Sequence, residues 1–338
     1  MAERVDLSII IINYKSAALL ADCLRTVYAQ TARISFEVIV VDNMSNDDSR
    51  RILTEQFPSI RWVQMDYNAG FARANNAGYR VSTGNMVLLL NPDTLIVDHA
   101  IENCCEALLP GPYMGAGVQL LNPDGTPQIS GNYAMRGGLN YLLPLPYLGN
   151  FIKKLGNTFK VSKPNVPDSN DTIEVDWING AFLMVKRVAW EAAGGLDEEF
   201  FLYAEEAEWC SRLKKAGKLC IFGQYKVIHL QGETANETFG SAGKGYYNLY
   251  DRKGLQIMVS NFLRIRKEFG AGWFLLDLAV YFFEIFIFPL GLLIDKCLHG
   301  KRARYHWEQV PQYLGNVFRL IGLSPYMLAR RRRFYKVL

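Results

Sequence analysis

The chain has 338 residues, a length that allows one large domain or two smaller ones. Half of its residues are apolar, which is enough for a substantial core and excludes a disordered chain. The net charge of +4 is modest and gives no reason to expect a nucleic-acid partner. Basic residues gather near the C-terminal end instead, at Arg330 to Arg333 and Lys336.

Cysteine usage and the N-terminus both favour a cytoplasmic catalytic part. The six cysteines form no C-x-x-C pair, which argues against a zinc or redox motif and favours free thiols. The first apolar run is short and follows Glu3 and Asp6, so it predicts a buried strand rather than a signal peptide.

Apolar runs alternate with helical stretches along the first part of the chain. The predicted strands are Leu7 to Asn13, Phe36 to Val41, Ile60 to Gln64 and Met86 to Leu90, and the predicted helices are Ser16 to Gln30, Ser49 to Gln56 and Ala72 to Val81. This alternation predicts an α/β fold with a doubly wound, mostly parallel sheet. Ligands of such sheets bind beyond the carboxyl ends of the strands. Those ends carry small polar or acidic residues, namely Asn13, Asp42, Asn43, Asn91 and Asp93.

The middle of the chain is less regular. Residues 131 to 171 are rich in Pro, Gly and Asn and show no clear period, which predicts a long, partly mobile excursion and a candidate acceptor loop. Regular structure should resume at Val175, and the catalytic part should end near Gly240. We therefore expect a catalytic domain at 1–240 and a helical, membrane-associating region at 241–338.

Two polar stretches are candidates for nucleotide binding. Asp42, Asn43 and Asn13 could hydrogen-bond a pyrimidine base, or Asp42 could simply close its strand as an Asx turn. Further along, Asn68 is placed to cap a helix and Gly70 permits a close backbone approach. The N-terminus of that helix would favour an anionic diphosphate, and the alternative is an ordinary cap on a tightly packed helix.

Asp93 and His229 are candidate metal ligands. Asp93 follows a buried strand, where a carboxylate can bind a divalent cation together with a diphosphate, although N-P-D is also a common turn. His229 ends a short strand, and its imidazole suits a metal such as Mn²⁺ or serves as a hydrogen-bonded core or surface histidine.

Three acids begin a helix that is predicted to run to about Ala216. Glu205, Glu206 and Glu208 suit the positive end of the helix dipole in that place. They also follow the apolar run FFLY, so one of them could lie in a cleft and act as a general base.

The ordered set of motifs resembles family 2 glycosyltransferases of the GT-A fold, in the bacterial rhamnosyltransferase-like branch. The motifs lie between residues 7 and 234 and read, in order, SIIIINY, VIVVDNMSND, NAGFARANNAG, LLLNPDT, WINGAFLMVKR, GGLDEEFFLYAEEAEWCSRLKKAG and VIHLQGET. The resemblance implies a Rossmann-like GT-A domain and an inverting transferase that uses a dTDP- or UDP-linked sugar. It favours rhamnose, moved to a glycan or polyprenyl-linked glycan in cell-surface polysaccharide synthesis.

The resemblance also implies roles for individual residues. Donor contacts are implied for Asn13, Asp42, Asn43, Asn68, Phe71, Ala72, Asn76 and Asn91, and a wall between donor and acceptor for Trp177, Asn179, Gly180 and Glu205. Asp93 and His229 correspond to ligands of Mn²⁺ or Mg²⁺, and Glu206 corresponds to the general base. Two positions depart from the family pattern: Asn91 stands in place of the first Asp of D-x-D, and Glu206 stands in place of an Asp.

Other functions fit the sequence less well. A nucleotide-sugar pyrophosphorylase should follow its first strand with a Gly-rich basic loop, which is missing here. A catalytically idle binding protein of the same fold would not need the acids Asp93 and Glu206. A transferase for another hexose or for galactofuranose stays open as an alternative.

The stretch Gly272 to Ile294 is long and apolar enough to span a bilayer. Its Asp277, Tyr281 and Glu284 share one helical face, and basic clusters flank it on both sides, which conflicts with a single span under the positive-inside rule. We expect a peripheral or re-entrant helix at the cytoplasmic face of the plasma membrane. The alternative is a buried helix of a soluble bundle.

Overall fold

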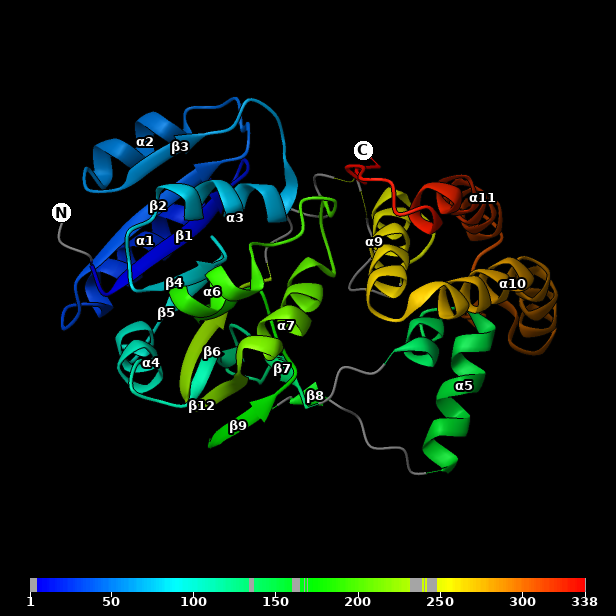
Figure 1. Ribbon diagram of the computed structural model, residues 1–338. Coiled ribbons are helices and arrows are strands. Elements are labelled where there is room, and N and C mark those ends of the chain that lie inside the picture. Colours follow the sequence, from blue (N-terminus) through cyan, green and yellow to red (C-terminus); the bar gives the residue numbers. More distant parts are fainter. Residues whose placement is uncertain are drawn as a thin grey trace. The chain divides into compact units, whose positions relative to one another are not determined.

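The computed structural model describes residues 5–133, 137–159, 165–166, 168, 170–231, 239, 241 and 248–337 (Figure 1). The chain divides into two compact units. The first comprises Met1–Met135, Pro164–Phe201 and Glu205–Thr234, and the second comprises Arg136–Lys163, Leu202–Ala204 and Ala235–Leu338.

A central nine-stranded sheet organises the first unit, in the order β3-β2-β1-β4-β11-β6-β12-β5, with β9 paired to β12. Its strands are β1 (Leu7–Asn13), β2 (Phe36–Asp42), β3 (Arg61–Gln64), β4 (Met86–Leu90), β5 (Thr94–Ile96), β6 (Tyr113–Leu121), β9 (Thr172–Val175), β11 (Phe182–Lys186) and β12 (Lys218–His229). A small three-stranded sheet contains β7 (Gly131–Asn132), β8 (Asn165–Val166) and β10 (Trp177–Ile178).

The strands β3, β2, β1 and β4 are parallel, and their register aligns their carboxyl ends. Asn13 lies opposite Asp42, and Asp42 lies opposite Gln64. The predicted α/β fold with C-terminal helices is therefore confirmed. Beyond β4 the sheet is mixed, because β11 runs antiparallel to both β4 and β6. Apolar patterning alone does not reveal this change of direction.

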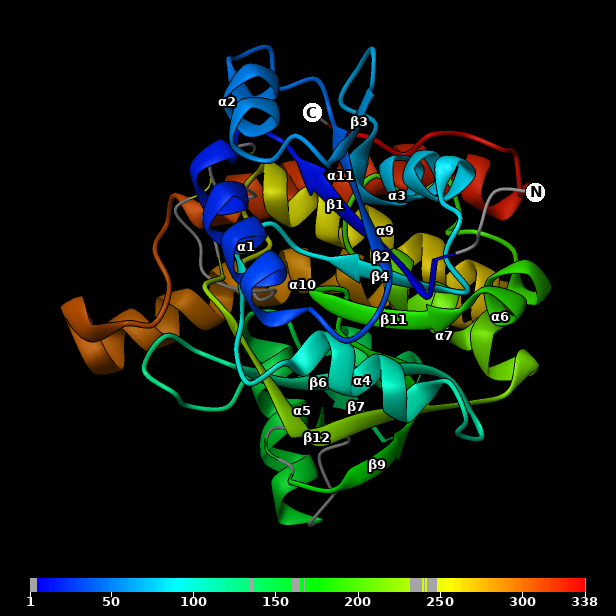
Figure 2. The same ribbon diagram turned by 90° about the vertical axis from the view of Figure 1, so that its left-hand side faces the viewer.

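Helices cover both faces of the sheet. They are α1 (Ala17–Gln30), α2 (Ser49–Gln56), α3 (Gly70–Val81), α4 (Ala100–Leu108), α6 (Arg187–Ala193) and α7 (Glu205–Ala216). Successive side chains of a strand point to opposite faces. Ile9 and Ile11 accordingly pack with residues of α1 and α4, seen on the near side in Figure 2, whereas Ile10 packs with α3 and α7. An apolar core therefore packs against each face of the sheet and fixes the position of the carboxyl ends of its strands.

The described part of the second unit is helical. It contains η1 (Gly138–Leu142), α5 (Tyr147–Thr158), α9 (Arg252–Glu268), α10 (Gly270–His299), η3 (Gly300–Arg302) and α11 (Gln309–Leu328). The expectation of an irregular excursion at 131–171 is wrong where the structure describes it, because η1 and α5 form there. Residues 136–163 also join this second unit, whereas the two-domain prediction placed them in the catalytic domain. The predicted boundary at Gly240 lies outside the described residues.

Helix α10 turns polar side chains inward and apolar side chains outward. Its buried residues are Phe274, Asp277, Tyr281, Glu284, Phe288 and Leu292. Its exposed large apolar residues are Trp273, Leu275, Leu276, Phe282, Phe283, Phe286, Ile287, Leu290, Leu293, Ile294 and Leu298. The helix is long and apolar enough to cross a membrane, and 28% of its most apolar window is buried. Most of this window therefore presents apolar surface outward rather than into the unit.

Candidate active site

A buried polar network closes the carboxyl ends of β1, β2 and β3. The Asp42 carboxylate accepts hydrogen bonds from Asn13 Nδ2 and Gln64 Nε2, both at 2.7 Å, and from the Ser45 amide at 3.1 Å. Asn13 and Asp42 are both buried. The structure thus brings the first two predicted donor residues together and holds them rigidly. Ser45 and Gln64 complete the network, although no motif singled them out.

Asn43 connects this network to the start of α3. Its Oδ1 accepts from the Ala69 amide at 2.7 Å, and its Nδ2 donates to Asn68 Oδ1 at 3.1 Å. Asn68 Oδ1 also accepts from the Gly70 amide at 3.2 Å, but the N-cap position of α3 is taken by Ala69 and not, as predicted, by Asn68. The Phe71 amide donates to the Phe201 carbonyl at 2.9 Å. These three amides at the start of α3 therefore have protein acceptors, and the structure does not support a diphosphate site built from them.

Gly70 permits a close approach, as the sequence predicted, but the approaching group belongs to the protein. A Cβ at this position would lie 2.0 Å from the Phe201 carbonyl oxygen, and Gly70 has a φ of +74°. Only glycine accommodates both the contact and the left-handed backbone. The glycine therefore joins α3 to the segment that leads into the acidic helix α7.

Two predicted donor residues face the protein interior. Ala72 is fully buried in the core between α3 and the sheet. Asn76 donates from Nδ2 to the Leu196 carbonyl at 2.8 Å and accepts at Oδ1 from the Leu196 amide at 3.0 Å. These two hydrogen bonds give a reason for an asparagine inside α3, because they hold the loop before α7 against this helix. Both residues position neighbouring segments and, like Asn13 and Asp42, expose little surface to a ligand.

Residues from three separate segments meet around Gly180. A Cβ at Gly180 would lie 3.5 Å from Phe71 Cζ and 3.5 Å from Glu206 Cγ. The absence of a side chain at Gly180 therefore leaves room between α3 and the first turn of α7. The sequence assigned these residues separately to the donor site, the wall and the general base, and the structure brings all three together.

The three acids at the start of α7 have different surroundings. Glu208 is bound by Arg212 through two hydrogen bonds of 2.8 and 2.7 Å. Glu205 is buried, and burial first and the neighbouring charge of Glu206 second raise its pKa well above the usual range. Glu206 is half-buried. Because Glu208 is in an ion pair and Glu205 favours its neutral form, Glu206 is the acid of this group best suited to accept a proton.

A strained turn precedes these acids. Tyr203 and Ala204 have φ values of 73° and 64°, in the left-handed region that residues with a Cβ rarely adopt. Each such residue costs on the order of 1–3 kcal/mol. The turn sets the point at which α7 begins. Neither residue type signals positive φ, so sequence patterns could not reveal it.

Asp93 and His229 lie side by side because β12 pairs with β5. His229 is opposite Thr94, the residue that follows Asp93. Its Nε2 lies 3.4 Å from Asp93 Oδ1 and 3.5 Å from Asn91 Nδ2. Both residues are largely buried, with side chains 13% and 11% exposed. The two predicted metal ligands are therefore brought together, with Asn91 beside them.

Gln128, which sequence analysis missed, orients the His229 ring. Gln128 Nε2 donates to Asn122 Oδ1 at 2.8 Å and to the His229 carbonyl at 2.7 Å, which fixes the direction of its amide. Its Oε1 then faces His229 Nδ1 at 2.9 Å, so Nδ1 carries the proton. In a neutral imidazole the Nε2 lone pair consequently faces Asp93. No sequence motif surrounds Gln128, and only the fold brings it to His229.

The side chains of Asp93 and His229 are suited to bind one divalent cation together. A nitrogen lone pair and a carboxylate oxygen that face each other are both acceptors, and a cation between them relieves their repulsion. No cluster of three or more His, Cys, Asp or Glu side chains suited to a metal occurs among the described residues. A bound ion would therefore take further ligands from phosphate oxygens, as magnesium and manganese commonly do.

The turn after β10 lies between Asp93 and His229 on one side and the residues around Gly180 and Glu206 on the other. Asn179 Oδ1 accepts from the Ala181 amide at 2.9 Å, and Asn179 Nδ2 donates to the Ile129 carbonyl, next to Gln128. The Asn91 amide donates to the Ala181 carbonyl at 3.0 Å. Trp177, at the start of β10, is half-buried, and its indole N–H has no hydrogen-bond partner among the described residues. Asn179 therefore shapes the turn, whereas the Trp177 indole N–H is a buried donor without an acceptor in the described part of the chain.

The chain resembles known glycosyltransferases in sequence. Residues 8–162 match the family model for glycosyl transferase family 2. The chain is 28% identical over 254 residues to a low-salt glycan biosynthesis hexosyltransferase of Haloferax volcanii, covering 73% of this chain and 74% of that protein. It is 27% identical over 209 residues to an N-acetylglucosaminyl-diphospho-decaprenol L-rhamnosyltransferase of Mycobacterium tuberculosis, covering 57% and 66% of the two chains.

A solved structure agrees on the fold. The mannosyltransferase of Pyrobaculum calidifontis in complex with GDP-Man and Mn²⁺ superposes with a TM-score of 0.50 at 15% identity, over 98% of this chain and 89% of that one. At this identity the similarity concerns the fold alone. Together with the family match, it supports the GT-A fold of this chain. Residues 8–162 therefore carry a glycosyl transferase family 2 domain, and the relatives of the chain include rhamnosyltransferases.

Proposed function

We propose that the protein transfers a sugar, with inversion of configuration, from a nucleoside-diphosphate donor to a hydroxyl of a lipid-linked glycan in cell-surface polysaccharide synthesis. The donor nucleotide is dTDP or UDP, and rhamnose is the favoured sugar over galactofuranose or another hexose. The observation that carries the proposal is the meeting of Phe71, Gly180 and Glu206, since a Cβ at Gly180 would lie 3.5 Å from each of the other two side chains.

The reaction needs one proton acceptor and one leaving group. Glu206 removes the proton from the acceptor hydroxyl, and that oxygen attacks the anomeric carbon from the face opposite the nucleotide. The bond to the donor diphosphate breaks as the new glycosidic bond forms, so the configuration at the sugar inverts in one displacement. Burial raises the pKa of Glu205 well above its usual range, which favours its neutral form and limits the negative charge beside the base.

Asp93 and His229 are the residues that would hold a divalent cation, and Gln128 keeps the His229 lone pair turned toward it. When bound, Mn²⁺ or Mg²⁺ supplies positive charge against the leaving diphosphate. Support for Mn²⁺ comes from the chemistry of this nitrogen–carboxylate pair and from the archaeal mannosyltransferase, whose complex contains that ion.

The acceptor is proposed to lie in the membrane. The mycobacterial relative is named for a decaprenol-linked substrate, which supports a polyprenyl-linked acceptor here. Helix α10 exposes a long apolar face and buries Asp277 and Glu284 completely, so neither acid needs to enter lipid. We place the protein at the cytoplasmic face of the plasma membrane, with α10 peripheral or re-entrant.

A donor screen tests the reaction. Full-length protein is incubated with dTDP- and UDP-linked sugars, with and without Mn²⁺, and release of the nucleoside diphosphate is measured. We expect one donor class to be hydrolysed only with the metal, and Asp93→Ala to lower the rate by about 10²-fold or more. Binding of a nucleotide sugar without any turnover would instead support a catalytically idle member of the fold.

A further inference from the structure

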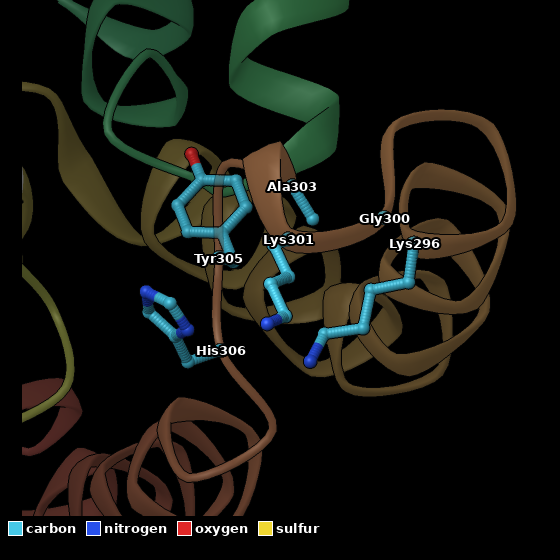
Figure 3. A pocket seen from close by; sticks show the side chains of 6 residues that line it. All are labelled: Lys296, Gly300, Lys301, Ala303, Tyr305 and His306. Carbon is cyan, nitrogen blue, oxygen red and sulfur yellow. The ribbon is translucent and has the colours of Figure 1, made fainter.

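A pocket of 280 Å³ lies where α10 ends and the chain continues through η3. It is lined by Lys296, Gly300, Lys301, Ala303, Tyr305 and His306. Figure 3 shows the side chains of Lys296 and Lys301 extending into the same space, with the His306 ring across from them. The pocket therefore gathers two ammonium groups and an imidazole.

The two lysines of the pocket lack an acidic partner in the part of the chain that the structure describes. Among the described residues, neither Lys296 nor Lys301 forms an ion pair with an Asp or Glu side chain. Asp295, the nearest acid in the sequence, instead accepts hydrogen bonds from the Arg304 amide at 2.9 Å and from the Tyr147 hydroxyl at 3.1 Å. Within the described residues, the Asp295 carboxylate is therefore bound by other groups and not by the lysines of the pocket.

Further positive charge surrounds the pocket. Arg302 and Arg304 are exposed in the same segment. The pKa of Lys153 is lowered, first by burial and then by the charge of Arg304, which indicates that like charges are held near one another. Basic residues suit the last turn of a helix, which accounts for Lys296. That preference falls off within the last turn, so it does not account for Lys301 and the arginines beyond the helix.

The surface before the pocket along α10 is apolar. Leu293, Ile294 and Leu298 are exposed by 51%, 52% and 73%, on the last turns before Gly300. An apolar helix that ends in clustered basic residues is the pattern of a segment lying at a membrane surface. Free phosphate would use only the charges, whereas a lipid would use the charges and the adjoining apolar surface.

We propose that this pocket binds the phosphate headgroup of an anionic membrane lipid, with Lys296 and Lys301 as the contacting cations. The inference rests on the membrane location proposed above. It adds to that location a defined phosphate site at the end of α10. A pocket that recognises phosphate specifically differs from a general attraction of basic residues to a negative surface, and the two can be told apart by experiment.

Flotation of the full-length protein with vesicles tests the proposal. Phosphatidylcholine vesicles carry either phosphatidic acid or, at the same surface charge, oleate, whose anion is a carboxylate. The pocket variant is Lys296→Gln/Lys301→Gln, and the charge-matched control is Arg331→Gln/Arg332→Gln on the exposed C-terminal segment. Lys296→Arg/Lys301→Arg keeps the charge, and melting curves show whether each variant is folded.

The control variant should lose only the general attraction of two basic residues, about 1 kcal/mol each, which corresponds to roughly 30-fold. The pocket variant should bind phosphatidic acid vesicles more weakly than the control does, because it loses the phosphate contacts as well. Its binding to oleate vesicles should match that of the control variant, and the Arg variant should stay close to wild type. Equal losses for the pocket and control variants on both vesicle types would overturn the proposal.

Two other outcomes would also overturn it. The first is a wild-type chain that binds neither vesicle type. The second is a pocket that responds to inorganic phosphate in melting curves while vesicle binding is unchanged by the pocket substitutions. Donor hydrolysis, measured on the same samples, reports separately on the proposed function. Its absence in wild type would contradict the transferase assignment and leave the vesicle result standing.

Discussion

Glu205 shows how a single buried acid couples this site to pH. Its pKa is raised from an ordinary value of 4.5 by burial and by Glu206, so the folded protein holds a proton that the unfolded chain releases. The unfolded state therefore binds fewer protons above that value, and stability falls as pH rises. We expect a slope of up to about 1.4 kcal/mol per pH unit, starting near the ordinary value.

Glu205→Gln is neutral at every pH and should remove this slope. Denaturant melts of both proteins at several pH values measure it, with the variant gaining stability relative to wild type as pH rises. Parallel curves for the two proteins would mean that Glu205 is ionised in the folded state. Glu208→Gln serves as the control, because it breaks the ion pair with Arg212 and should destabilise without removing the slope.

Gln128 gives a second test at the scale of one residue. Gln128→Leu removes the acceptor that fixes the proton on His229 Nδ1, so the ring can adopt the other tautomer or turn away from Asp93. Partners of metal-binding histidines typically contribute about 10–100-fold to metal affinity. We expect Mn²⁺ binding, measured by calorimetry, to weaken by that factor. Unchanged affinity would remove Gln128 from the metal site.

The sequence predicted which residues belong to the site better than it predicted the role of each one. Asp93 and His229 were expected to act together, and the structure places their side chains 3.4 Å apart. Phe71 and Glu206 were assigned to separate roles, and the structure brings both of them near Gly180. Asn76 was expected to hold the donor, but its amide binds the Leu196 backbone. A side chain's partner depends on which segments the fold brings together. Gln128, with no motif around it, shows the same limit.

At the scale of elements, Gly70 decides how α3 meets the segment before α7. Gly70→Ala places a Cβ 2.0 Å from the Phe201 carbonyl oxygen and requires a positive φ, so it should cost several kcal/mol and lower the melting temperature. Gly125→Ala is the matched control, with a φ of +81° and nothing within 4 Å. It should cost about 1–2 kcal/mol, for the backbone conformation alone. Equal losses in the two variants would mean that the Phe201 contact yields without cost.

Helix α10 gives the second test at this scale. Phe283 and Phe286 are each 61% exposed, whereas Phe288 is fully buried. Phe283→Ser/Phe286→Ser should leave the melting temperature nearly unchanged and weaken binding to neutral phosphatidylcholine vesicles, because each buried aromatic contributes about 1.5–3 kcal/mol. Phe288→Ser should instead destabilise the fold. If the double variant binds vesicles as well as wild type, the apolar face of α10 is not the membrane contact.

The elements themselves were predictable where their patterns were regular. The strand Met86–Leu90 and the helix Ser49–Gln56 begin and end where apolar periodicity placed them. Helix α5 was missed because its glycines and asparagines, typical of loops, hide its helical pattern. The turn at Tyr203 and Ala204 was missed because positive φ in such residues is imposed by the surrounding structure.

At the scale of the whole molecule, the second unit is assembled from distant parts of the chain. The Tyr281 hydroxyl of α10 donates to the Tyr141 carbonyl of η1, and the Tyr147 amide of α5 donates to Glu284. A chain cut near Gly270 would therefore strip η1 and α5 of their partners and expose their packing surfaces. For this reason membrane binding is better tested with point variants of the full chain than with a truncation.

The proposed function joins these scales in one reaction, and its central claim is that Glu206 serves as the base of an inverting transfer. The most direct measurement follows the anomeric proton of the transferred sugar by NMR during turnover, in wild type and in Glu206→Gln. We predict a product with the configuration opposite to that of the donor, formed about 10²-fold more slowly by the variant, with donor affinity little changed. A product of retained configuration, or a variant as fast as wild type, would contradict the account.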